Sequence, residues 1–260
     1  MLAVIRNGLA AASNDISLIS NNIANAGSTG FKRSSSQFVD SYVVEQTKAP
    51  GATAGSGVKA LDPRRDHSQG GLKATGSALD LAISGTGMFQ TVMPGVDGDV
   101  TYTRDGSMQL DALGRISNSD GRVLMATDGT ALTVPLTIAD GENATQALDT
   151  ISITEDGKIK AIYSASGIVN VGTIALANFA NVAGLAAIGG GHFKQSDQSG
   201  APRMGAPAVG DFGKVLGGNL EMSNINVTNE LVRLMKAQQA YSGSSRVLQA
   251  ETEIAKRLID

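Results

Sequence analysis

Residues 20–33 read SNNIANAGSTGFKR, and this stretch sets the organisation of the chain around it. It follows a helical pattern that starts near the N-terminus. One capping side chain and one glycine are enough to end a helix, so the remaining polar groups need another role. We expect Asn21, Asn22 and Asn25 to form hydrogen bonds with neighbouring copies of the same chain. Gly30 lets the chain turn at the helix end, and Phe31 anchors that turn as a buried aromatic.

Upstream of this stretch, apolar residues recur with gaps that alternate between three and four. They are Leu2, Ile5, Leu9, Ala12, Ile16, Ile19 and Ile23. A stripe with this spacing is typical of a coiled-coil helix. The residues between are mostly alanine, serine and asparagine with very little charge, which indicates that more than one face of the helix is covered.

A second heptad pattern occupies the other end of the chain. Asn226 or Thr228 can cap a helix of about 33 residues there. Its apolar rows are Leu234, Tyr241, Leu248 and Ala255, and beside them Ala240, Val247 and Ile254. Two core helices of an ordinary globular domain would give similar stripes. Because these stripes stand at opposite ends of the chain, we expect the two helices to pair as a coiled-coil module, within one chain or between chains.

The middle of the chain has the pattern of short strands and tight turns. Asp-Gly pairs recur at 97–98, 105–106, 120–121, 128–129, 140–141 and 156–157, with apolar or alternating runs between them. Glycine accepts positive φ at such corners, so these pairs predict β-hairpins and an all-β domain. The predicted fold class is α+β, in five segments. They are the N-terminal helix and turn (1–45), an extended linker (46–77), the central β domain (78–190), a return linker (191–222) and the C-terminal helix (223–260).

The composition excludes several classes of protein. A net charge of −3 without a basic patch argues against nucleic acid as the main partner. The absence of cysteine excludes disulfides, thiolate catalysis and cysteine-ligated metals. No stretch approaches the roughly 20 apolar residues that span a bilayer, so no membrane insertion is expected. The N-terminus lacks the pattern of a cleaved signal peptide, so export would use another route.

Catalytic and metal-binding patterns are also missing from the sequence. The two histidines, His67 and His192, lie in Gly-rich or charged segments without a second histidine at metal-ligand spacing, and we expect both at the surface. The run SGTGMFQ (84–90) does not complete the dinucleotide pattern, because Gln90 takes the place of the last glycine. The sequence therefore predicts no catalytic residue, no cofactor, no metal site and no enzyme activity.

Four stretches together carry a family likeness. They are SNNIANAGSTGFKRSSSQF (20–38), LDLAISGTGMFQ (79–90), YTRDGSMQLDALGRISNSDGRVL (102–124) and LGGNLEMSNINVTNELVRLMKAQQAYSGSSRVLQ (216–249). In this order they resemble the signatures of the bacterial flagellar rod and hook proteins. Met88 and Met108 depart from that pattern, which usually has an aromatic residue at each position.

The resemblance implies a structural subunit of the flagellar rod, which assembles into a hollow helical tube, transmits torque to the hook and lets export substrates pass. It implies copies of the same chain, the proximal rod, the hook and the surrounding L/P-ring bushing as partners, and a place in the periplasm-spanning basal body. Hook proteins usually carry an inserted outer domain, for which this chain has no room. Residues 175–193 and 200–213 resemble the distal rod subunit, and hook subunits share them, while proximal rod subunits typically depart more from Thr-Gly-Phe-Lys. The resemblance therefore favours the distal type, with a proximal rod subunit or a short hook subunit as alternatives. A secreted binding module that displays the β domain on a stalk is a further alternative, and the shortage of aromatic residues in that domain disfavours it.

The expected subunit-interface residues come from the two helices and the turn after the first. They are Leu2, Ile5, Leu9, Ile16, Ile19, Asn21, Asn22, Ile23, Asn25, Gly30, Phe31, Leu234, Tyr241, Val247, Leu248 and Ile254.

Overall fold

The computed structural model describes residues 2–43, 54–96, 98–140, 144–163 and 167–259. The chain divides into two units, a helical unit and a β unit. The helical unit comprises residues 1–26, 33–66 and 225–260, and the β unit comprises residues 27–32 and 67–224. The short segment 27–32 therefore belongs to the β unit, although the residues on both sides of it belong to the helical unit.

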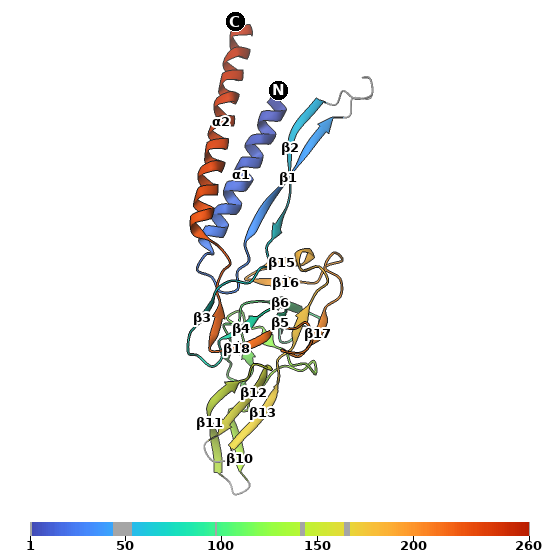
Figure 1. The fold of residues 1–260 in the computed structure, drawn as a ribbon, viewed down its shortest axis with the longest axis vertical. Helices are drawn as coiled ribbons and strands as arrows, with labels where there is room; N and C mark the ends of the chain where they lie inside the picture. Colours follow the sequence, from blue (N-terminus) through green and yellow to red (C-terminus); the bar gives the residue numbers. More distant parts are fainter. Residues whose placement is uncertain (1, 44–53, 97, 141–143, 164–166, 260) are drawn as a thin grey trace. The chain divides into compact units, whose positions relative to one another are not determined.

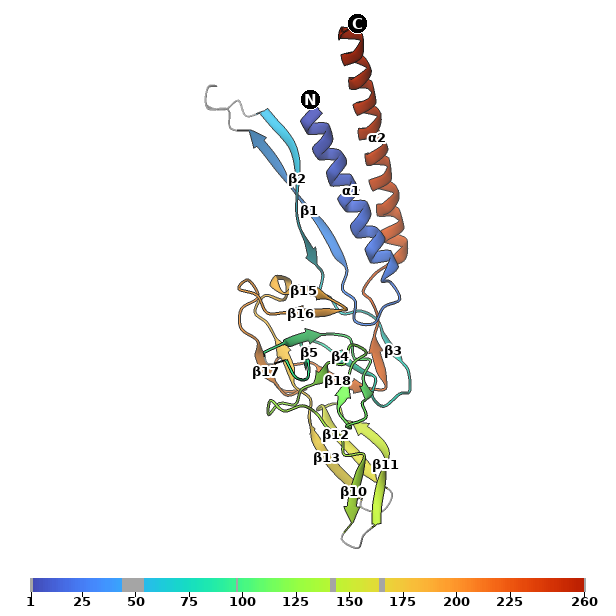
Figure 2. The same cartoon turned by 180° about the vertical axis from the view of Figure 1, so that it is seen from behind.

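The helical unit is built from two long helices and a β-hairpin. Helix α1 (Leu2–Ala24) lies between helix α2 (Val227–Ile259) and the antiparallel strands β1 (Ser34–Val43) and β2 (Ala54–Arg65) (Figures 1 and 2). The predicted cap of α2 is present, because the side-chain oxygen of Asn226 accepts a hydrogen bond from the Asn229 amide at 3.1 Å. Neither helix, over its described residues, is long and apolar enough to cross a bilayer.

The prediction that the two helices pair as a coiled-coil module is wrong. The rows expected to form the seam are largely exposed on α2, with Tyr241, Val247 and Ile254 all open to solvent in the single chain. The covered face of α2 carries the buried Glu230 and Ala237, and only Leu234 and Leu248 of the predicted rows are half-buried. A coiled-coil seam needs continuous apolar contact between two helices. Here α1 divides its contacts between α2 and the hairpin.

The β unit consists of many short strands. They are β3 (Leu72–Ala74), β4 (Leu81–Ser84), β5 (Met88–Val92), β6 (Val100–Thr103), β7 (Gln109–Leu110), β8 (Ile116–Ser117), β9 (Val123–Leu124), β10 (Thr137–Asp140), β11 (Ala144–Ile153), β12 (Lys158–Tyr163), β13 (Gly167–Thr173), β14 (Leu176–Asn178), β15 (Ala186–Gly189), β16 (His192–Lys194), β17 (Arg203–Gly205), β18 (Lys214–Gly217) and β19 (Asn219–Glu221). One short 3₁₀ segment, η1, spans Val182–Gly184. A central β domain is therefore present, as the turn pattern predicts.

The pairing of these strands is antiparallel throughout the described sheets. The largest sheet runs in the order β15-β16-β6-β5-β9-β8-β7, with β14 joining β5 to β17. A separate sheet runs β10-β11-β12-β13, and β18 pairs with β4 and β19 with β3. The main apolar core lies among these sheets and consists of Leu81, Ile83, Phe89, Ile116, Leu124, Leu132, Val134, Ile159, Ile174, Leu176 and Val215 with their neighbours. A smaller cluster contains Tyr102 and Phe179, whose rings are arranged edge to face with their centroids 4.8 Å apart.

Most of the Asp-Gly corners behave as the sequence predicts, with φ of +76° at Gly121, +81° at Gly129 and +72° at Gly157. Gly106 differs, because its φ is not in the left-handed region. It is required for another reason: a Cβ on Gly106 would lie 1.8 Å from the carbonyl oxygen of Leu81. This corner therefore needs glycine for the close approach of two backbones.

Strands also form where the sequence predicts linkers. Residues 46–53 lie outside the described residues, but β2 and β3 fall within the segment 46–77, and β16 to β19 fall within 191–222. Gly and Pro in β2 lower its strand propensity. The pairing of β2 with β1 shifts register around Asp62 and Pro63, which form a bulge between Leu61 and Arg64. A bulge accommodates proline, which has no N–H to donate to the ladder.

Candidate subunit interface

Helix α2 carries apolar side chains that the single chain leaves uncovered. Val227, Leu231 and Met235 follow one another at four-residue spacing, with Val232 beside them, and Val247 and Ile254 are seven residues apart. These residues are between 42% and 60% exposed, and we call them the α2 apolar surface. Side chains four residues apart lie along one side of a helix, and so do side chains seven residues apart. At about 100° per residue, the twelve residues from Met235 to Val247 turn the second group by about 120°, so the α2 apolar surface consists of two patches. Exposed apolar side chains gathered along a helix are typical of sites of protein association.

The interface residues predicted on α2 fall into two groups. Val247 and Ile254 belong to the α2 apolar surface, and Tyr241 is also exposed. Leu234 and Leu248 are half-buried, on the covered face of α2. Val227, Leu231, Val232 and Met235 are not among the predicted interface residues. Their four-residue spacing can be read from the sequence, but the prediction used the seven-residue spacing of Leu234, Tyr241 and Leu248 and of Val247 and Ile254.

The interface residues predicted on α1 are partly covered within the chain. Ile19 is 1% exposed, whereas Ile5, Leu9, Ile16 and Ile23 are half-buried. Leu2 is the first residue of the helix. The stripe on α1 therefore packs in part inside the helical unit.

Asn22 is fully buried and makes its hydrogen bonds within the chain. Its amide nitrogen donates to the Ser34 carbonyl at 2.8 Å and to Glu230 Oε2 at 3.1 Å, and its oxygen accepts from the Ser34 amide at 3.0 Å. Glu230 also accepts a bond from Arg33 Nε at 2.6 Å. Burial opposes ionisation of Glu230, but the bonds from Asn22 and Arg33 outweigh it and hold the pKa of this carboxyl below its usual value. Asn22 thus joins α1, β1 and α2 inside one molecule, and its predicted role toward a neighbouring copy stays a prediction.

The other two asparagines differ from Asn22. Asn21 is exposed, and Asn25 donates from its amide to the Asn21 carbonyl at 2.9 Å at the end of α1. For Asn21 and Asn25, hydrogen bonding to neighbouring copies of the chain stays a prediction.

Replacing Asn22 with alanine is expected to lower the free energy of unfolding by about 1–3 kcal/mol, because buried partners in Ser34 and Glu230 lose hydrogen bonds. Urea denaturation measures the change. Asn21→Ala is the matched control on the same helix turn, and as an exposed substitution it should change stability by less than about 0.5 kcal/mol. Equal effects of the two substitutions would contradict the structural role of Asn22.

The β unit contains a buried ionic cluster that was not predicted from the sequence. Glu221 is fully buried and accepts bonds from Lys32 Nζ at 2.6 Å, Arg104 Nη1 at 3.1 Å and the Gly70 amide at 2.9 Å. Lys32 also donates to the Ser68 carbonyl at 2.7 Å. Burial lowers the pKa of Arg104, and the Glu221 carboxylate opposes that change. One carboxylate therefore ties together four separate stretches of the β unit.

The segment 27–32 is fixed in the β unit by further contacts. The Gly30 amide donates to the Glu221 carbonyl at 2.8 Å, and the Phe31 carbonyl accepts from the Asn224 amide at 3.4 Å. The Thr29 hydroxyl donates to Asp105 Oδ1 at 2.8 Å. Gly30 is buried and has φ of +62°, and Phe31 is half-buried. The polar turn of the opening stretch is thus an integral part of the β unit.

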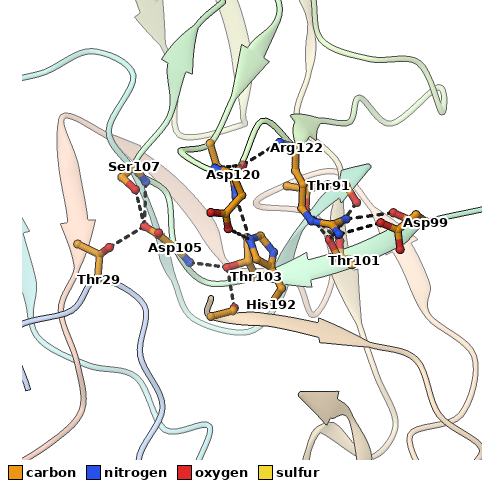
Figure 3. Close-up of polar contacts among 12 residues, drawn as sticks. Thr29, Thr91, Asp99, Thr101, Thr103, Asp105, Ser107, Asp120, Arg122 and His192 are labelled. Atoms are coloured by element: carbon orange, nitrogen blue, oxygen red, sulfur yellow. Dashed lines mark hydrogen bonds and ion pairs between the residues drawn. The ribbon is translucent and has the colours of Figure 1, made fainter. Parts of the chain in front are cut away.

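His192 lies in a polar network in the same unit (Figure 3). The expectation of a surface histidine is wrong for this residue, which is 4% exposed. Its Nε2 lies 2.9 Å from Asn118 Nδ2 and 3.2 Å from Asp120 Oδ2. Close by, Asp99 pairs with Lys194 at 2.6 Å and with Arg122 at 2.7 Å, and hydrogen bonds from these two cations lower the pKa of Asp99. No cluster of three potential metal-binding side chains occurs in the part of the chain that the structure describes.

Comparison with known proteins identifies the relatives of this chain. Residues 82–161 match the flagellar hook protein FlgE/F/G D1 domain, and residues 216–260 match the flagellar basal body rod FlgEFG protein C-terminal region. The first match falls within the β unit, and the second contains α2.

Full-length relatives agree with these matches. The flagellar basal-body rod protein FlgG of Buchnera aphidicola subsp. Baizongia pistaciae is 34% identical over 99% of this chain and 97% of its own length. The protein of the same name from Agrobacterium fabrum is 34% identical over 98% and 96%. The flagellar hook protein FlgE of Escherichia coli is 32% identical, but over only 47% of this chain and 31% of its own length. The chain therefore belongs to the family of flagellar basal-body rod and hook proteins.

Proposed function

We propose that this chain is a structural subunit of the bacterial flagellar rod, of the distal type, and not an enzyme. The observation that carries the proposal is its similarity to rod proteins named FlgG along nearly its whole length, whereas the similarity to the hook protein FlgE covers about half of it. The proposed partners are copies of the chain, the neighbouring axial proteins of rod and hook, and the ring proteins that surround the rod in the periplasm.

The α2 apolar surface supports assembly with copies of the same chain. A surface that contacts a different surface on the next copy produces an open, helical polymer. Val247 and Ile254 are 52% and 60% exposed, so burying the rest of each side chain in such a contact would contribute about 1–2 kcal/mol. The proposed polymer is a hollow tube that transmits torque and lets exported proteins pass.

The double variant Val247→Glu/Ile254→Glu is expected to prevent polymer formation without unfolding the chain. A loss of at least about 3 kcal/mol per contact raises the protein concentration needed for polymers more than about a hundredfold. Negative-stain electron microscopy and light scattering over a concentration series measure this threshold. Val247→Leu/Ile254→Leu keeps the surface apolar and should polymerise like the unaltered chain. Polymers of the glutamate variant at the unaltered threshold would exclude the patch of Val247 and Ile254 from the interface.

The placement in the rod is tested in a bacterium that lacks its own FlgG. Expression of this chain should restore complete rods in isolated basal bodies, and antibody labelling should locate the chain there. Labelling of the hook alone would favour the hook subunit, the alternative supported by the FlgE match. Discrete monomers with no label on basal bodies would favour a secreted binding module.

A further inference from the structure

One nitrogen of His192 faces two neighbours with opposite requirements. Nε2 lies 2.9 Å from the amide nitrogen of Asn118, which only donates, and 3.2 Å from a carboxylate oxygen of Asp120, which accepts when ionised. A neutral imidazole nitrogen either accepts or donates, so it satisfies one neighbour at a time. The protonation state of the ring therefore decides which neighbour is bound.

The orientation of the Asn118 amide is fixed by its other contacts. Its oxygen accepts from the Asp120 amide at 3.1 Å and from the Arg122 amide at 2.9 Å. Turning the side chain over would place NH₂ against these two N–H donors. Nδ2 consequently stays directed at His192, so the neutral ring accepts at Nε2. The proton is then on Nδ1, which is buried without a hydrogen-bond partner among the described residues.

We propose that His192 is a pH-dependent switch in the β unit, which exchanges Asn118 for Asp120 when the ring gains a proton and thereby loosens the β15–β16 hairpin. In the protonated ring Nε2 donates to the Asp120 carboxylate and repels the Asn118 amide. The Asp120–Gly121 corner joins β8 to β9, whereas His192 is paired with Thr103 of β6. The exchange of partners thus acts where β16, β6 and the β8–β9 corner meet in one sheet.

The surrounding charges set the direction of the effect. Asp120 and, after β6, Asp105 favour the protonated ring, and Arg122 at the start of β9 disfavours it. Lys194 on the strand of His192 is paired with Asp99. Burial, followed by Arg122, lowers the pKa of His192 below the ordinary 6.5. The unfolded chain then binds this proton more readily than the folded one. Stability from His192 is complete above pH 6.5 and is lost as the pH falls toward the folded-state pKa.

The turn of the β15–β16 hairpin lies against Asp120 and is rich in glycine. Gly189, Gly190 and Gly191 all have positive φ, and a Cβ on Gly190 would come within 3.1 Å of Asp120 Oδ2. The Gly191 carbonyl accepts from the Thr103 hydroxyl at 2.9 Å, and the same hydroxyl accepts from the Asp105 amide at 3.0 Å. The hairpin is thus held to β6 next to the group that titrates.

The test combines NMR titration with hydrogen exchange on the intact chain. Because His67 is the only other histidine, both rings can be followed separately. At pH 7.5, ¹⁵N shifts of His192 should report the Nδ1–H tautomer, and the ring should titrate below pH 6.5. Between pH 6.5 and its folded-state pKa, opening of the β15–β16 amides, corrected for intrinsic exchange, should increase up to about tenfold per pH unit.

Three variants separate the switch from a structural role. His192→Gln should remove the acid-induced opening, and His67→Gln should leave it unchanged. Asn118→Asp, which replaces the donor with a carboxylate, should raise the titration midpoint of His192. Titration of His192 at or above pH 6.5, the Nε2–H tautomer at pH 7.5, or acid-induced opening that persists in His192→Gln would each overturn the proposal.

Discussion

Glu221→Ala is expected to lower the free energy of unfolding by about 3–5 kcal/mol, because it leaves Lys32 and Arg104 buried without their shared carboxylate. Lys32 and Glu221 have fully buried side chains, and that of Arg104 is 7% exposed. Bulk water does not reach the two cations at that depth. Urea denaturation followed by circular dichroism measures the loss.

Two further substitutions give the expected order of effects. Lys32→Met leaves Glu221 paired with Arg104, so it should be less harmful than Glu221→Ala. Glu155→Ala breaks the ion pair with Lys214. The side chain of Glu155 is 62% exposed and that of Lys214 59%, so this substitution should lower the free energy of unfolding by less than about 1 kcal/mol. If Glu221→Ala proved as mild as Glu155→Ala, the buried cluster would not contribute to stability.

Gly30→Ala is expected to destabilise the chain by about 2–5 kcal/mol, through left-handed backbone strain and overpacking together. Gly30 has φ of +62°, and a Cβ there would lie 2.5 Å from the amide nitrogen of Asp105. Backbone atoms cannot turn away as a side-chain tip can. The segment 27–32 would have to move, and with it the bond from the Gly30 amide to the Glu221 carbonyl.

Gly27→Ala is the matched control in the same segment. A Cβ on Gly27 would meet nothing within 4 Å, and its φ is not in the left-handed region. Thermal unfolding of both variants should show a decrease of many degrees for Gly30→Ala and almost none for Gly27→Ala. Similar melting temperatures for the two variants would show that the turn tolerates a side chain at residue 30.

Local patterns predicted local structure well. Both long helices, the Asn226 cap and the Asp-Gly corners follow from residues near one another in the sequence. Strand β2 was missed because its Gly and Pro residues argue against a strand, and only pairing with β1 makes one. Tertiary pairing overrides weak propensity in such segments.

The partners of side chains were the least predictable part of the fold. Heptad spacing on α2 does not say which residues the chain itself covers, and the outward-facing Met235 and the buried Glu230 are only five residues apart. Lys32 and Glu221 are 189 residues apart in sequence, and His192 and Asn118 are 74 apart. No local pattern contains such pairs. The sequence offered one signal for the pair of Lys32 and Glu221: these residues of opposite charge lie in two of the stretches that carry the family likeness.

The assignment of residues 27–32 to the β unit has a consequence for the proposed role in transmitting torque. The polypeptide passes between the two units after residues 26, 32, 66 and 224. Four covalent connections therefore share any force that twists one unit against the other, where a simple insertion would have two. A protease cut at one of them would leave three intact, so the two units would stay tethered under load.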